Sequence, residues 1–309
     1  MNVLVTGITG YIGSQLAPRL LADGHAVRGM SRRPAHTRGP VQAPAAVEVV
    51  RADAITGAGL QRALAGIDVA YFLIHSMEPS TDGAFDRRER RAAENFARAA
   101  RAAGVERIIY LGGPSPADAS PSAHLASRLA VEEILLGAVP RSVALRASLV
   151  IGSRSRSFRF LVRLVERMPV LLVPAWRSHR TSPIDQRDVI ELLTRAATSD
   201  HVCGQSLDAA GPEVVSYGEL IDRIREQMLV SRPTIGLRLT MTPIASRIAA
   251  LIAGEQHALI GPLMDSLESD LLPRDNRAGE LLGVRLHSLD AAIERALREW
   301  EMTEHLAAR

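Results

Sequence analysis

One stretch near the start of the chain governs how the rest of it folds: Thr6-Gly7-Ile8-Thr9-Gly10-Tyr11-Ile12-Gly13. It follows an apolar run at residues 2–6 that predicts a strand, and its last glycine opens a helical pattern. In that context Gly7 permits a tight turn, Gly10 lets the backbone approach a pyrophosphate, and Gly13 lets helix and strand pack closely. The N–H groups at the start of the helix would bind the anion. The alternative is a glycine turn that binds nothing.

The first half of the chain alternates short β-branched runs with longer helical patterns, which is typical of βαβ units and a parallel sheet. We expect strands at residues 2–6, 26–31, 47–51, 69–74, 107–111 and 142–145. We expect helices between them at residues 12–23, 57–65, 84–103 and 124–136. The sequence therefore predicts an α/β fold with a doubly wound parallel sheet.

The alternation is broken in the second half. Helical patterns at residues 154–168, 185–198, 216–228 and 286–304 are joined by short strand-like runs at 170–173 and 206–209. We expect a dinucleotide-binding domain at residues 1–155, with return segments within 180–211. Residues 212–309 are expected to form a smaller, mostly helical region on the substrate side.

Two further strand ends carry side chains that suit a dinucleotide. The second expected strand ends in Ser31-Arg32-Arg33, where a hydroxyl and guanidinium groups suit a 2′-phosphate and no acidic residue marks a free ribose hydroxyl. NADP(H) is therefore favoured over NAD(H), the alternative being that the arginines are a solvated loop pair. Asp53, followed by Ala54, comes after the third strand, and its carboxylate either accepts from the adenine amino group or caps the next helix.

The composition excludes several classes of chemistry. The 309 residues contain no lysine, so all 37 residues in the Lys+Arg count are arginine, against 34 acidic residues for a formal net charge of +3. Schiff-base and pyridoxal-phosphate enzymes, Walker-type phosphate loops and a lysine-assisted tyrosine acid all need a primary amine and are excluded. So small a charge surplus does not indicate nucleic-acid binding.

The chain offers no set of residues for a disulfide or a metal, and no membrane span. Cys203 is the only cysteine, and His179 and Asp185 have no partners at metal-ligand spacing. The most apolar late stretch, residues 239–263, is interrupted by charged residues and prolines. This stretch either packs in the core or a dimer contact, or lies on a membrane surface. With no signal-peptide pattern at the start, we expect a cytoplasmic location, and a homo-oligomer is one assembly open to the chain.

Several motifs together resemble one family. They are the TGITGYIG run, the Ser31-Arg32 strand end, the run GIDVAYFLIHSM at residues 66–77, and the helix start His124-Leu125-Ala126-Ser127-Arg128. The chain resembles the atypical, NmrA-like short-chain dehydrogenases/reductases, and the likeness continues through residues 145–152 and 209–213. The resemblance implies a Rossmann domain with a smaller C-terminal substrate domain and an NAD(P) cofactor. It also implies that the ends of strands four and five, with His75, Ser76 and Gly112, line the nicotinamide side.

The sequence departs from the wider superfamily where that superfamily transfers protons. Its reductases use a tyrosine and, four positions on, a lysine, with a serine or threonine at the end of strand five. Here His124 and Arg128 occupy the two helix positions, and Gly112-Gly113 stands at the strand end. The spacing of four keeps His124 and Arg128 on one helix face. His124 is then either a proton donor or a helix-start residue without chemistry, and Arg128 is a candidate ribose ligand.

The neighbouring charges affect the role expected of His124 and Arg128. A fixed guanidinium beside His124 would disfavour the protonated imidazole and weaken it as a donor, so the pair suits binding better than catalysis. Ser127 is an auxiliary hydroxyl that contacts either ribose or the helix face. The run Arg87-Arg88-Glu89-Arg90-Arg91 is interpreted as a solvated or subunit-facing surface with no ligand.

Two functions from different classes remain. The first is an NADP(H)-dependent oxidoreductase or isomerase that acts on a small apolar carbonyl-type substrate, with His124, Ser127 and Arg128 as candidate catalytic residues and His124 or a water as the proton source. The second is a non-catalytic NADP-sensing regulator or assembly factor of the NmrA type, which the missing tyrosine–lysine pair favours.

Overall fold

The molecule is built around one parallel sheet. The structure is a computed structural model and describes residues 1–33, 47–74, 85–114, 123–167, 171–173, 175–231, 234–236, 269–304 and 306. Seven strands lie in the order β11-β6-β5-β4-β1-β2-β3, and every neighbouring pair is parallel. Their bounds are β1 (Asn2–Thr6), β2 (Ala26–Ser31), β3 (Glu48–Arg51), β4 (Val69–Phe72), β5 (Arg107–Gly112), β6 (Val143–Ala147) and β11 (Ser206–Ala209). The predicted α/β fold with a doubly wound sheet is confirmed.

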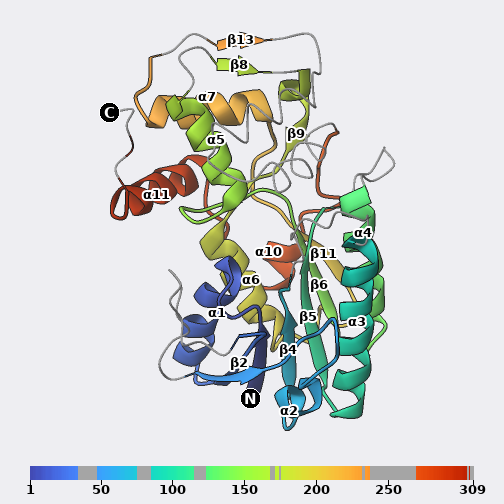
Figure 1. Ribbon diagram of the computed structural model, residues 1–309. Helices are drawn as coiled ribbons and strands as arrows, with labels where there is room; N and C mark the ends of the chain where they lie inside the picture. The colour runs from blue at the N-terminus through green and yellow to red at the C-terminus, as the bar shows by residue number, and fades with distance from the viewer. Residues whose placement is uncertain are drawn as a thin grey trace.

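Helices cover both faces of the sheet because its central strands, such as β1 and β4, bury apolar side chains on both sides (Figure 1). Side chains of one parity, such as Val3, Val5 and Tyr71, share a core with α1 (Tyr11–Ala22) and α6 (Gln186–Ala196). Side chains of the other parity, such as Leu4 and Phe72, form a second core on the opposite face. That face is covered by α2 (Leu60–Leu64), α3 (Phe85–Ala102) and α4 (Ala123–Leu136).

Local chemistry places the helix boundaries. The helix α6 begins after Asp185, whose carboxylate accepts from the backbone N–H of Arg187, and Ser216 caps α7 (Tyr217–Gln227) through the N–H of Glu219. The helix predicted at residues 57–65 is shorter in the structure. Gly57 and Gly59 have φ angles of 79° and 76°, so the chain makes left-handed turns before α2 starts.

The second half of the chain forms a third core beyond the carboxyl end of the sheet (Figure 1). It packs α5 (Arg156–Arg167), α7 and α11 (Leu289–Glu301) around Trp176, Tyr217 and Trp300. The other elements of this half are short: β7 (Val150–Ile151), β8 (Leu171–Val173), η1 (Ala175–Ser178), β9 (Arg180–Thr181), β10 (Ile184–Asp185), β12 (Val215–Ser216), β13 (Thr234–Gly236) and α10 (Ala278–Leu281). In sequence, the residues of this core run from Leu149 to Leu306.

Trp300 is the centre of this third core. Its ring is completely buried, and its indole N–H donates to Glu304 at 3.1 Å. The guanidinium carbons of Arg159 and Arg163 lie 4.4 and 4.9 Å from the ring centroid, as expected of cation–π contacts. One aromatic side chain thus joins α11 to α5.

Replacing Trp300 with alanine should therefore be costly. The cavity and the lost ring contacts predict a fall of about 3–5 kcal/mol in the free energy of unfolding, measured by urea denaturation. Met302, two residues on and 76% exposed, supplies the control, because Met302→Ala should change stability by less than about 0.5 kcal/mol. Equal effects of the two substitutions would contradict this account of the core.

Candidate functional site

The glycine-rich loop lies where the order of strands reverses. It follows β1, and β1 pairs with β2 on one side and with β4 on the other. In open α/β sheets, the crevice beyond the carboxyl ends of two such strands is where ligands bind. The loop Gly7–Gly10 and the start of α1 therefore stand at the ligand-binding edge.

Each of the three glycines in this loop is required by a close backbone approach. Gly7 has a φ angle of 62°, and a Cβ atom there would lie 3.1 Å from the carbonyl oxygen of Leu73, just beyond β4. A Cβ on Gly10 would lie 3.0 Å from the carbonyl oxygen of Gly7, which already accepts from the Gly10 N–H at 2.7 Å. A Cβ on Gly13 would overlap the same carbonyl oxygen. Side chains are thus kept out of the turn.

The start of α1 has the properties of an anion site. Gly10 is its N-cap residue and provides no side-chain acceptor, and no acidic residue lies in the first turn. The first N–H groups of a helix have no partner within the helix, and no side chain caps them here. Gly10 is exposed, and Thr9, Tyr11 and Ile12 are partly exposed. These residues fit the pyrophosphate of a dinucleotide.

The side chain of Tyr11 packs with its hydroxyl end against Gly152. Its hydroxyl is buried and has no hydrogen-bond partner in the described part of the chain. It packs against the α-carbon of Gly152, directly after β7, so closely that a Cβ there would collide with it. Burial raises the pKa of Tyr11 well above its ordinary value, and the nearby Asp185 acts in the same direction. Tyr11 therefore remains a neutral phenol that packs the loop against the second half of the chain.

The ends of β2 and β3 present the remaining adenine-side candidates. Ser31 closes its own turn, since its hydroxyl donates to the carbonyl of Arg33 at 2.8 Å, and both Arg32 and Arg33 are exposed. Asp53 accepts from the N–H of Ile55 at 2.8 Å, whereas the N-cap of α2 is Gly59. Asp53 is therefore no helix cap, and of its two expected roles only the contact with adenine stays open. The adjacent Ala54 is buried.

The nicotinamide-side candidates are only partly placed. His75 and Ser76 lie outside the described residues, as does the side chain of His124, whose backbone lies in the first turn of α4. Gly112 is buried at the end of β5, where a Cβ would come within 2.7 Å of the Tyr110 ring. The strand end thus admits no larger residue without movement of that ring.

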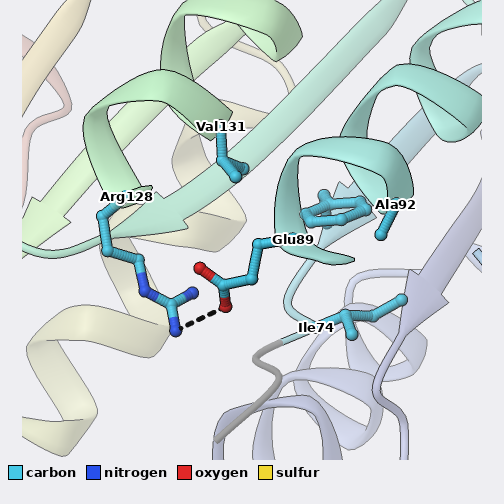
Figure 2. Close-up of a pocket in the computed structure, with 6 residues that line it drawn as sticks. Ile74, Glu89, Ala92, Arg128 and Val131 are labelled. Atoms are coloured by element: carbon cyan, nitrogen blue, oxygen red, sulfur yellow. Dashed lines mark ion pairs between the residues drawn. The ribbon is translucent and has the colours of Figure 1, made fainter. Parts of the chain in front are cut away.

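Ser127 and Arg128 face α3 and share one carboxylate. Arg128 makes an ion pair with Glu89, with 2.9 Å between the guanidinium nitrogen and the carboxylate oxygen (Figure 2). The hydroxyl of Ser127 donates to the other carboxylate oxygen, also at 2.9 Å. Ser127 thus makes the expected helix-face contact, and the proposed contact of Arg128 with ribose stays a prediction.

Glu89 corrects the interpretation of the arginine-rich run on α3. Its neighbours Arg87, Arg88, Arg90 and Arg91 are exposed as expected, but Glu89 is only 4% exposed. The buried positions of α3 recur at 89, 92, 93, 96 and 97, which is the spacing of one helix face. That spacing was the available signal, and the surrounding charges concealed it.

A second buried charge cluster, at the carboxyl ends of β6 and β11, was not expected from the sequence. Arg146 donates through Nε to Glu132 of α4 at 2.7 Å, and its Nη1 lies 3.9 Å from Asp208 on the neighbouring strand. Asp208 also accepts from the backbone N–H of Arg274 at 2.7 Å. Burial raises the pKa of Asp208 to about 6, although Arg146 and the backbone N–H of Asp275 act in the opposite direction.

The remaining candidates have structural partners. Asp185, the cap of α6, is buried and bonds Arg187 and Arg295. Burial acts to raise its pKa, but these hydrogen bonds and charges hold it below the ordinary value. His179 donates its backbone N–H to Trp176. Within the described ranges, no three His, Cys, Asp or Glu side chains gather as metal ligands, and no helix is long and apolar enough to cross a bilayer.

Comparison with known proteins agrees with this geometry. Residues 7–139 match a family model described as NAD(P)H-binding. The chain is 33% identical over 172 residues to a ceramide reductase of Caulobacter vibrioides, covering 55% of this chain and 53% of that protein. It is 25% identical over 234 residues to the mitochondrial NADH dehydrogenase 1 alpha subcomplex subunit 9 of Arabidopsis thaliana. This match covers 72% of this chain and 58% of that protein. The chain thus spans little more than half the length of these relatives.

The fold has counterparts among solved structures. A nucleoside-diphosphate-sugar epimerase of Staphylococcus aureus superposes with a TM-score of 0.75 over 95% of this chain and 100% of that one, at 16% identity. Such a likeness shows the fold. Together with the family match, it confirms an NAD(P)H-binding Rossmann domain, and the NmrA-like resemblance is consistent with it.

The raised pKa of Asp208 predicts a pH-dependent stability. The folded protein binds the proton of the Asp208 carboxyl more tightly than the unfolded chain does. The stability that this protonation contributes is therefore present near pH 4 and is lost as the pH rises through about 6. Unfolding free energies of the wild type and Asp208→Asn, measured from pH 4 to pH 7.5, should therefore diverge. The wild type should lose about 2–3 kcal/mol relative to the variant.

Asp270→Asn supplies the contrasting control. Partial burial acts to raise the pKa of Asp270, but hydrogen bonds from Arg180 hold it below its ordinary value. Its stabilising contribution should therefore be lost as the pH falls, which is the opposite sign. A difference between wild type and Asp208→Asn that is constant with pH would contradict the assignment.

Proposed function

Because residues 7–139 match an NAD(P)H-binding family model, we propose that the chain is an NADP(H)-dependent oxidoreductase or isomerase of the short-chain dehydrogenase/reductase type, acting on a small apolar carbonyl-type substrate. One observation carries the proposal. At the point where the strand order reverses, three glycines keep side chains out of the turn after β1, and no side chain caps the start of α1. When bound there, the dinucleotide supplies hydride transfer.

The adenine half of the site supports the choice of NADP(H). Ser31 orders the turn after β2, and the exposed guanidinium groups of Arg32 and Arg33 follow it. A 2′-phosphate accepts charge-assisted hydrogen bonds from arginine, whereas a free ribose hydroxyl is better held by a carboxylate. The carboxylate of Asp53 would contact adenine at the end of the next strand.

On the nicotinamide side, Glu89 changes how the residues of α4 are understood. An unpaired guanidinium at Arg128 would disfavour a protonated His124 one helical turn earlier, but Glu89 neutralises that guanidinium. His124 is thereby retained as a proton donor, with a water as the other source. Arg128 would hold the ribose, and His75, Ser76 and Gly112 would line the nicotinamide.

The apolar substrate is supported by the relatives and by the late part of the chain. The Caulobacter relative is named a ceramide reductase, and ceramide is an apolar lipid. Residues 239–263, the most apolar late stretch of the sequence, lie outside the described residues. A cytoplasmic location and a homo-oligomer belong to the same proposal.

A non-catalytic role is the second candidate, and the contacts of Glu89 with α4 favour it. Glu89 binds both Ser127 and Arg128, so two of the three proposed catalytic residues serve packing between α3 and α4. The plant mitochondrial relative is named as a subunit of a larger dehydrogenase. On this reading the protein senses NADP or assists assembly without turnover.

Turnover separates the two candidates. The enzyme should oxidise NADPH with at least one member of a panel of apolar ketones, aldehydes and enones, followed by absorbance at 340 nm. His124→Ala should lower that rate by about 100-fold or more, as expected for loss of a general acid, while leaving NADPH binding intact. No oxidation across the panel, with NADPH still bound, would favour the sensing role.

The cofactor preference rests on two arginines. The double variant Arg32→Ala/Arg33→Ala should bind NADPH about 10- to 100-fold more weakly in a fluorescence titration, because it loses charge-assisted hydrogen bonds to the 2′-phosphate. Its affinity for NADH should change by less than about threefold. Arg98→Ala, an exposed arginine on α3, is the matched control. Equal losses for both dinucleotides would contradict the assignment.

A further inference from the structure

The ion pair of Glu89 and Arg128 lies at the carboxyl edge of the sheet, on the side away from the adenine half. Its neighbours are Phe72 at the end of β4 and Ile74 directly after it. With Ala92 and Val131 they line a small cavity of about 10 Å³, which is the lower limit for one water molecule (Figure 2). A Cβ on Gly113, just after β5, would lie 3.9 Å from the Arg128 side chain. The pair is thus placed by the two strand ends where the nicotinamide half is expected.

The pair is buried and held in one arrangement. Glu89 and Arg128 are 4% and 5% exposed, so their charges act in a medium of lower dielectric than water. A guanidinium is a cation, so the neutrality of the pair depends on the Glu89 carboxylate. Ser127 donates to the second carboxylate oxygen and fixes the orientation of Glu89. The local net charge of the three side chains is therefore zero.

This neutrality matters because the two forms of a nicotinamide dinucleotide differ in charge. The oxidised ring carries a positive charge that the reduced ring lacks. A fixed cation at the same edge disfavours the oxidised form, a fixed anion favours it, and a neutral pair does neither. We propose that Glu89, by neutralising Arg128, sets the relative affinity of the protein for oxidised and reduced dinucleotide. The inference rests on the NAD(P)H-binding site described above and holds for an enzyme or a sensor.

The other charged side chains near this pair do not take over the role of Glu89 in neutralising Arg128. One turn further along α4, Glu132 is paired with Arg146 and Ser206, so that cluster is internally balanced apart from Asp208. The exposed arginines of α3 face solvent, where water and salt screen them. Glu89 is the carboxylate paired with Arg128 across the boundary between α3 and α4.

The test measures the ratio of dissociation constants, NADP⁺ over NADPH, by calorimetric titration at pH 8. In Glu89→Gln the charge of Arg128 is no longer balanced by the Glu89 carboxylate, which should raise this ratio by about threefold to tenfold. In Arg128→Met the Glu89 carboxylate is no longer balanced by a guanidinium, which should lower the ratio by a similar factor, even if both forms bind more weakly. The double variant Glu89→Gln/Arg128→Met restores neutrality, so its ratio should lie within about twofold of the wild type.

Glu132→Gln is the matched control, since it breaks a second buried Glu–Arg pair, which joins α4 to β6. It should lower stability as Glu89→Gln does and leave the ratio within about twofold of the wild type. If Glu89→Gln does not fold, the lowered ratio in Arg128→Met and its recovery in the double variant still decide the matter. Binding with an unchanged ratio in Arg128→Met overturns this inference alone. Failure of the wild type to bind either dinucleotide overturns the proposed function as well.

Discussion

The molecule depends on the contact between the α-carbon of Gly13 and the carbonyl oxygen of Gly7. No side chain at residue 13 fits beside that oxygen. The approach sets α1 directly against the end of β1 and leaves its first N–H groups facing the crevice. It also fixes the turn that touches the backbone after β4. The position of α1 against the sheet and the shape of the turn both follow from this one close approach.

Arginine alone supplies the basic side chains, and this shapes the interior. Arg128, Arg146 and Arg163 are buried, and each meets a glutamate, on α3, on α4 and within α5 respectively. A planar guanidinium matches a carboxylate in direction as well as charge. Removing water from both partners is costly, so such pairs contribute more to the uniqueness of the packing than to stability. The first two pairs also fix the relative position of the segments they join.

The sequence was most informative where geometry is local. The glycine run predicted β1, α1 and the turn between them almost to the residue, because φ angles and close approaches constrain residue type directly. The period of the strands and helices likewise predicted the parallel sheet. The partners of Ser127 and Arg128 could not be predicted, because Glu89 is some forty residues away and sits within an arginine-rich run. Asp208 and Arg146 meet only through the strand register, which no local pattern reveals.

The third core has a consequence for the order in which the chain folds. The pairing of Arg163 with Glu304 spans 141 residues, and Trp300 rests on the same arginine. Contacts of such long range require closing a large loop, which is slow and entropically costly. The strands from β1 to β6, by contrast, join segments close in sequence. During synthesis the strands from β1 to β6 can pair early, whereas α5 stays uncovered until α11, near the end of the chain, has been made.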